Sequence, residues 1–209
     1  MNYIDRDEYM VLLEDSLKGS IRAVGNFKQR GNVFVYTGSN KALNKCEEIP
    51  VSYLCGRIWY GIIISWQYVE TPDAKQGALM PFVSIPFFTT MVKDIQKMVP
   101  IFRAEWDSYP QQEEVHPQPH WHFTHTKAVY EMLCPEFGEL EESWDMVLLD
   151  EYSRIMDEMP MSKMHFTMSE RWEEKGYMVL EVPSANKLAE WIARLLRHVE
   201  TEIRYILNE

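Results

Sequence analysis

The sequence predicts an α+β fold, in which a mostly antiparallel sheet is flanked by an N-terminal helix, an acidic middle helix and a long C-terminal helix. Apolar residues recur at steps of three and four near both ends of the chain, which is the period of an amphipathic helix. Between these ends, several segments alternate polar and apolar residues, as half-buried strands do. Because 46% of the 209 residues are hydrophobic and no linker is evident, we expect one globular domain over residues 1–209.

The first elements are a helix and two strands. The apolar spacing predicts a helix from Asp5 to about Gly25, followed by a short strand at Val33–Tyr36. A long strand rich in Ile, Trp and Tyr is expected at Arg57–Glu70, with a bend at Gly61.

The next segment, Pro81–Thr90, is an apolar strand that its two prolines place at a sheet edge, because proline cannot donate to a strand ladder. A short helix is expected at Met91–Met98, with Thr90 as its N-cap. Strands are then predicted at Ile101–Tyr109, His120–Thr126 and Met164–Met168.

Two helices complete the prediction. Leu140–Met159 has an acidic amphipathic pattern, and Ala185–Leu207 carries a continuous apolar stripe. The stripe fits a helix packed on its own sheet, and it also fits a helix that contacts another subunit.

The net charge of −11 is concentrated in the middle of the chain. Residues 111–160 hold 12 of the 32 acidic residues and only two of the 21 basic residues. An acidic balance argues against direct binding of a nucleic-acid backbone. A solvated loop and helix face is the simpler explanation of the acidic segment, and a docking surface for a basic partner is the alternative.

The three cysteines, Cys46, Cys55 and Cys134, form no C-x-x-C pair, which is typical of a reducing compartment. The chain has no apolar run long enough to span a membrane. It begins without a basic, apolar signal stretch, so we expect a cytoplasmic protein that is not inserted in a membrane.

The polar faces of three predicted strands contain the candidate site. Side chains alternate along a strand, so Glu105 and Asp107 share one face, and so do His120 and His122. His165 lies on the polar face of the third strand. If these strands are neighbours in matching register, the five side chains converge. In the alternative interpretation there is no site: the histidines hydrogen-bond to neighbouring carboxylates, and Arg103, Glu105 and Asp107 form cross-strand ion pairs with other surface charges.

Imidazoles and carboxylates are the ligands that divalent transition metals such as zinc take in proteins. Glu105, Asp107, His120, His122 and His165 are therefore the candidate ligands of one such metal. Three of them would leave a coordination position open for water, as catalytic zinc sites do.

A metal-free alternative comes from two related tetrads. His122-Phe123-Thr124-His125 and His165-Phe166-Thr167-Met168 share the core H-F-T, and this pairing resembles the signature of the 2H phosphoesterases. The resemblance covers eight residues, and the first tetrad departs from it at His125, where the family has a hydrophobic residue. It implies that His122 and His165 act as acid and base on a phosphodiester, with Thr124 and Thr167 holding the phosphate.

Two functions from different classes follow. The first is a cytosolic accessory subunit that binds another protein, or a second copy of itself, through the acidic middle region and the amphipathic C-terminal helix. The second is a small metal- or histidine-dependent hydrolase of phosphodiesters or nucleotides, in which Glu105, Asp107, His122 and His165 are catalytic.

Overall fold

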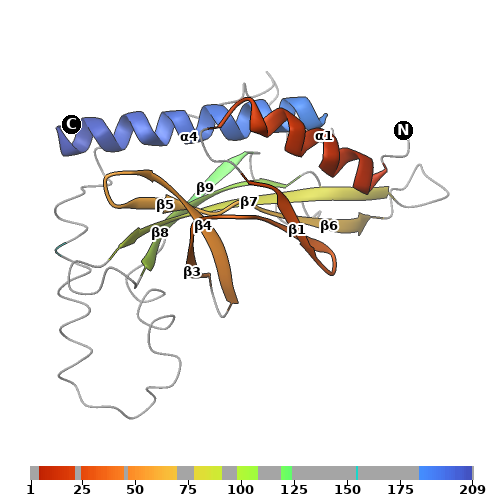
Figure 1. The fold of residues 1–209 in the computed structure, drawn as a ribbon, viewed down its shortest axis with the longest axis horizontal. Helices are drawn as coiled ribbons and strands as arrows, with labels where there is room; N and C mark the ends of the chain where they lie inside the picture. The colour runs from red at the N-terminus through yellow and green to blue at the C-terminus, as the bar shows by residue number, and fades with distance from the viewer. Residues whose placement is uncertain are drawn as a thin grey trace, which may run out of the picture.

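A computed structural model describes most of the N-terminal two thirds of the chain and its C-terminal helix (Figure 1). Within the described residues, two helices lie on one face of a curled, antiparallel nine-stranded sheet. The described residues are 5–21, 25–44, 47–69, 78–90, 98–107, 119–123, 154 and 184–208.

Helix α1 (Arg6–Lys18) begins where the sequence predicts and ends earlier. The Asp5 carboxylate caps it by accepting hydrogen bonds from the backbone N–H groups of Asp7 and Glu8. The helix stops at Gly19 instead of continuing to about Gly25. Glycine is the poorest helix former after proline, so the chain can leave the helix there at little expense.

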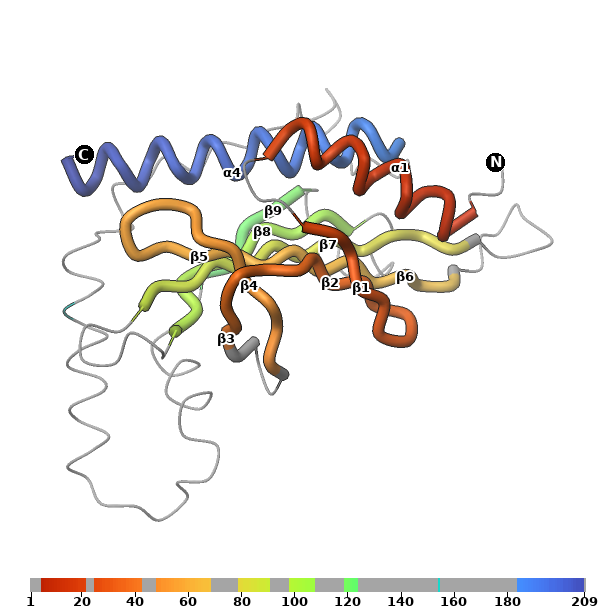
Figure 2. Tube along the Cα trace, viewed as in Figure 1, coloured from red at the N-terminus to blue at the C-terminus, as the bar shows by residue number. Residues whose placement is uncertain are grey.

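Helix α4 (Ala185–Leu207) has the bounds that the apolar spacing predicts. Ser184 caps its first turn, and Asn208 ends it in the left-handed conformation at φ 56°. Its apolar stripe is buried in the core formed with the sheet, as Leu188 and Ile192 illustrate at 0% exposure. The two helices lie side by side above the sheet, although they are the first and last elements described (Figure 2).

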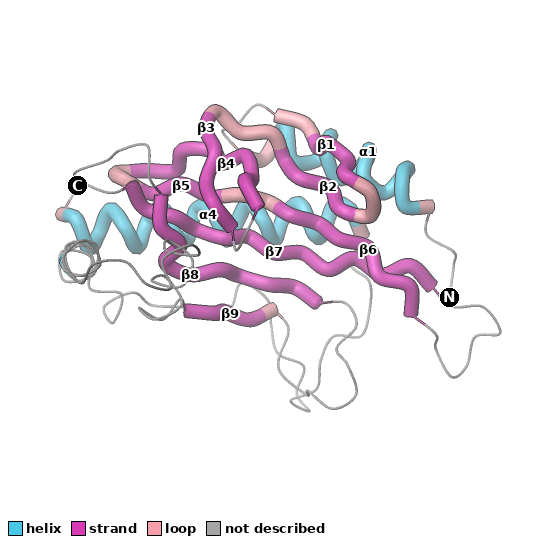
Figure 3. The backbone as a smooth tube through the Cα atoms, turned by 90° about the horizontal axis from the view of Figure 1, so that it is seen from below, coloured by secondary structure: helices cyan, strands magenta, loops and turns pink. Residues whose placement is uncertain are grey.

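The sheet has the order β1-β2-β6-β7-β5-β4-β3, and β8 and β9 extend it from the other edge of β7 (Figure 3). All of its paired strands are antiparallel. The strands are β1 (Phe27–Arg30), β2 (Val33–Tyr36), β3 (Asn40–Asn44), β4 (Glu47–Cys55), β5 (Ile58–Tyr60), β6 (Ile63–Val69), β7 (Ala78–Thr90), β8 (Met98–Asp107) and β9 (His120–Phe123).

The long strand predicted over Arg57–Glu70 is present as two segments, β5 and β6, which pair with β7 in one continuous register. Gly61 lies at the interruption, where its N–H still donates to the Pro86 carbonyl oxygen at 3.0 Å. A Cβ atom at position 61 would lie 2.9 Å from the Cδ1 atom of Ile49, so a larger residue at the bend requires the end of that side chain to shift.

The prediction that Pro81–Thr90 is an edge strand is wrong, because β7 lies in the sheet interior between β6 and β8. Both prolines lie where the hydrogen-bond ladder between β7 and a neighbouring strand is incomplete. Pro81 precedes Phe82, the first β7 residue that pairs with β8. The Pro86 carbonyl faces Gly61, and a strand residue directs its N–H and carbonyl to the same neighbour. The N–H that Pro86 lacks would therefore face the bend.

Three strands, β1, β3 and β4, were not expected from the sequence. Exposed charged residues in these strands, and Pro50 in β4, interrupt the alternation of polar and apolar residues that identifies a strand. The helix expected over Met91–Met98 is wrong at its end, because Met98 is a strand residue paired with Thr90. Residues 91–97 lie outside the described part of the chain.

Two clusters of buried side chains fill opposite faces of the sheet. The larger core joins the sheet to α1 and α4 and includes Trp66, Trp106 and Trp191. The smaller cluster lies on the other face, which we call the lower face, where side chains of β3 and β4 such as Ala42 and Ile49 pack against Phe88. The predicted acidic helix Leu140–Met159 and strand Met164–Met168 lie outside the described residues, apart from Arg154.

No helix among the described residues is long and apolar enough to cross a membrane. Cys55 is buried, and its thiol donates to the Glu200 carbonyl oxygen at 4.0 Å, whereas Cys46 and Cys134 are outside the described part of the chain.

Candidate metal centre

The alternation of β8 separates its core side chains from its polar ones. Ala104 and Trp106 are buried in the core shared with α4, where the Trp106 ring meets the Trp191 ring edge-on at 5.3 Å. Arg103, Glu105 and Asp107 alternate with them and therefore project from the lower face. The packing of two tryptophan rings fixes which side of β8 carries its charged groups.

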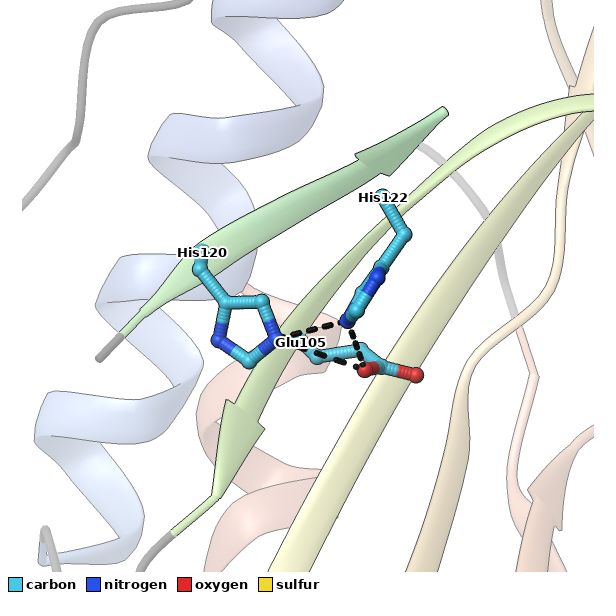
Figure 4. Close-up of side chains that lie close together, drawn as sticks. All are labelled: Glu105, His120 and His122. Atoms are coloured by element: carbon cyan, nitrogen blue, oxygen red, sulfur yellow. Dashed lines mark hydrogen bonds and ion pairs between the residues drawn. The ribbon is translucent and has the colours of Figure 1, made fainter. Parts of the chain in front are cut away.

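Strand β9 is the direct neighbour of β8, which meets the condition for convergence for two of the three predicted strands. Glu105 is paired with His120, and Arg103 is paired with His122. Trp121, between the two histidines, packs against the core on the opposite side. Both imidazoles consequently lie over the lower face, beside Glu105 (Figure 4).

Three ligand-type atoms meet at one point. The His122 Nε2 atom lies 2.8 Å from Glu105 Oε2 and 2.7 Å from His120 Nε2. The distance from His120 Nε2 to Glu105 Oε2 is 3.6 Å. These three residues form the one group of metal-ligand type found among the described residues. We call them the Glu-His-His triad.

The spacing of the triad suits a transition metal. Ligands about 2.0–2.1 Å from a tetrahedral zinc ion are about 3.3–3.4 Å from one another. The three separations in the triad, 2.7, 2.8 and 3.6 Å, bracket this value. Small side-chain movements would therefore bring all three atoms into coordination distance.

Glu105 remains ionised despite its burial. Its side chain is only 10% exposed, and burial alone would raise its pKa. The His120 imidazole and the Arg103 guanidinium, followed by the charge of His122, outweigh this effect and lower the pKa of Glu105 to about 2. At neutral pH the triad thus contains one carboxylate, which is the form that binds metal.

Burial lowers the pKa of His122, and the Arg103 charge acts in the same direction, whereas Glu105 opposes them. The net effect favours the neutral imidazole. A metal binds this form, because the coordinating nitrogen must present a lone pair.

Two further groups hold the outer oxygen of Glu105. Arg103 Nε donates to Oε1 at 2.6 Å, and the Ser84 hydroxyl on β7 donates to the same oxygen at 3.4 Å. Oε2 is thereby left directed at the histidines. The ion pair of Arg103 lies within β8, whereas a cross-strand pair was expected, and Ser84 was not predicted because only the β7–β8 register places that hydroxyl opposite Glu105. Second-layer partners of this kind orient metal ligands and tune their affinity.

Of the other predicted site residues, only Asp107 is among the described residues. Asp107 follows on the same face of β8, opposite Phe82, but is not among the three converging groups. His165 and the two threonines of the H-F-T tetrads, Thr124 and Thr167, lie outside the described residues. The pairing of His122 with His165 therefore stays a prediction.

The chain matches no known family model, and no curated protein or solved structure proved similar to it.

Proposed function

We propose that this protein is a metal-dependent hydrolase whose metal is held by the Glu-His-His triad. The observation that carries the proposal is the convergence of Glu105 Oε2 with the Nε2 atoms of His120 and His122, within 3.6 Å of one another. A divalent cation at that point would meet one charged and two neutral ligands, a set found in catalytic zinc sites.

The uneven burial of the triad favours a catalytic site over a structural one. Glu105 and His120 have side chains 10% and 13% exposed, whereas that of His122 is 40% exposed. Structural zinc sites are usually closed by four protein ligands. A metal held by these three ligands keeps a position for water or substrate, and it lowers the pKa of bound water to near 7.

The position of Arg103 favours an anionic substrate, such as the phosphodiester or nucleotide expected from the sequence. Its Nε is occupied by Glu105, but its terminal Nη groups make no hydrogen bond with any described residue. The side chain is 39% exposed on the same face as the triad. A guanidinium in this position can bind a phosphate oxygen while the metal polarises another.

The test compares wild type with Glu105→Gln and Asp107→Asn. Both substitutions convert a carboxylate on the same face of β8 to an amide, but only Glu105 belongs to the triad. We expect about one equivalent of metal by inductively coupled plasma mass spectrometry in wild type and Asp107→Asn, and a loss of at least about tenfold in affinity in Glu105→Gln.

Activity is then measured on bis(4-nitrophenyl) phosphate after loading with zinc, manganese or iron(II). Turnover that disappears with chelator and in Glu105→Gln, while the circular dichroism spectrum is unchanged, supports the hydrolase. Equal metal content in wild type and Glu105→Gln would refute the proposed centre. Metal binding without turnover of ester substrates would refute hydrolysis.

The accessory-subunit function expected from the sequence stays a prediction without a described surface to carry it. The acidic region lies almost wholly outside the described residues, and the apolar stripe of α4 is buried against the sheet of its own chain.

A further inference from the structure

A groove of ≈1060 Å³ lies on the lower face and is lined by residues of β1, β2, β3, β4, β6 and β7. Its floor is apolar and contains Val33, Val35 and Ile63, which alternate along β2 and β6 with residues of the main core. Strands β1, β3 and β4 supply much of its wall, and these are the three strands that the sequence did not disclose.

Three basic side chains line this groove. The Lys28 side chain forms no hydrogen bond or ion pair with a described residue, and the Arg30 side chain donates only to the Glu48 backbone carbonyl, at 3.4 Å. Lys41 is paired with the Glu48 carboxylate at 3.0 Å. The groove therefore has two positive charges that no described carboxylate balances, in a protein whose net charge is −11.

The strand register gives the distance between the basic side chains of the groove and the triad. A single row across the lower face runs through Lys28, Val35, Ile63, Ser84 and Glu105 on successive strands. At about 4.8 Å for each strand step, Lys28 and Glu105 are about 19 Å apart along the sheet. Lys28 is thus too distant to act on a group bound at the triad.

We infer that this groove is a separate binding site for a small organic anion that combines an apolar body with a carboxylate or phosphate. The apolar body would cover Val35 and Ile63, and the anionic group would lie beside Lys28 and Arg30. The volume is slightly above the range of about 300–1000 Å³ that is typical of small-molecule sites. Charge complementarity favours an anion over a neutral ligand of the same shape.

The experiment uses a matched pair of fluorescent probes, 1-pyrenebutyrate and 1-pyrenebutanol, which share the apolar body and differ in charge. Binding is titrated in the full-length protein with chelator present, so the result does not depend on metal at the triad. We expect wild type to bind the butyrate about fivefold more tightly than the butanol, or better.

Two double variants with equal net charge provide the control. Lys28→Gln/Arg30→Gln removes the two unbalanced charges in the groove, whereas Lys18→Gln/Arg194→Gln removes two charges from the helices on the other face. Preference for the butyrate should fall to about twofold or less in the groove variant and persist in the helix variant. Thermal melting of both variants checks that each is folded.

Three results would overturn the inference. Equal affinity for the two probes would show that charge does not contribute, and an equal loss of preference in both double variants would show only a general effect of net charge. Displacement of the butyrate by a polyglutamate peptide at similar concentration would identify an acidic peptide, not a small molecule, as the occupant.

Discussion

Glu105 offers a quantitative test of the electrostatics of the triad. In metal-free protein, Glu105→Gln keeps the size of the side chain and removes the charge that Arg103, His120 and His122 surround. We expect this variant to be less stable than wild type at neutral pH, because the Arg103 guanidinium loses the carboxylate that compensates its charge and the two imidazoles lose a charged neighbour.

The magnitude follows from the pKa of Glu105, which falls from an ordinary value of 4.5 to about 2 in the folded protein. At 1.36 kcal/mol for each pKa unit, this corresponds to about 3 kcal/mol of stability. The folded protein binds the Glu105 proton less tightly than the unfolded chain. The contribution is therefore fully present above pH 4.5 and disappears as the pH falls toward 2.

The assay is urea unfolding followed by tryptophan fluorescence, with chelator, at pH 7, 5 and 3. The stability difference between wild type and Glu105→Gln should reach up to about 3 kcal/mol at pH 7 and 5, and narrow by pH 3. Asp107→Asn, on the same face of β8, serves as the control for loss of a carboxylate. A difference that is independent of pH, or a variant more stable than wild type at pH 7, would refute the account of Glu105.

Further predictions concern the metal centre, the core and the β3–β4 pair. Zinc at about 100 times its dissociation constant should raise the Tm of wild type by about 5–10 °C and leave the Tm of His122→Ala unchanged. Differential scanning fluorimetry measures both values, and equal shifts in the two proteins would show that zinc binds elsewhere. Trp191→Ala should lower the free energy of unfolding by about 3–5 kcal/mol, because this side chain is 1% exposed; a loss below about 1 kcal/mol in urea would contradict its place in the core. Gly38→Ala should lower the free energy of unfolding by at least about 2 kcal/mol, since its Cβ would collide with the Val51 backbone carbonyl. Gly19→Ala, with nothing within 4 Å of the added Cβ, should be neutral in the same assay.

Local patterns in the sequence predicted the elements whose signal is carried by their own residues. The spacing of apolar side chains in Ala185–Leu207 gave both ends of α4, and alternation in β8 separated Trp106 from Glu105. These periods are properties of a single helix or strand, so they can be identified without knowing what the element contacts.

The β-strands with polar or proline-containing sequences were the least predictable. Pro81 and Pro86 suggested an edge strand, but β7 is central. The sheet tolerates both prolines because the N–H groups they lack would face the start of β8 pairing and the bend at Gly61. Such coincidences depend on neighbours far away in the sequence. The walls of the basic groove were missed for the same reason, since β1, β3 and β4 have little alternation of their own.

The sequence by itself determined the residue types and the face on which Glu105, Asp107, His120 and His122 lie. Only the tertiary structure decided which of them meet. The pairing of β9 with β8 places His120 opposite Glu105, and Ser84 on β7 holds the outer oxygen of that carboxylate, whereas Asp107 stays outside the triad. Strand register is fixed by contacts across the whole sheet, and a slip of one residue would turn every one of these side chains to the opposite face.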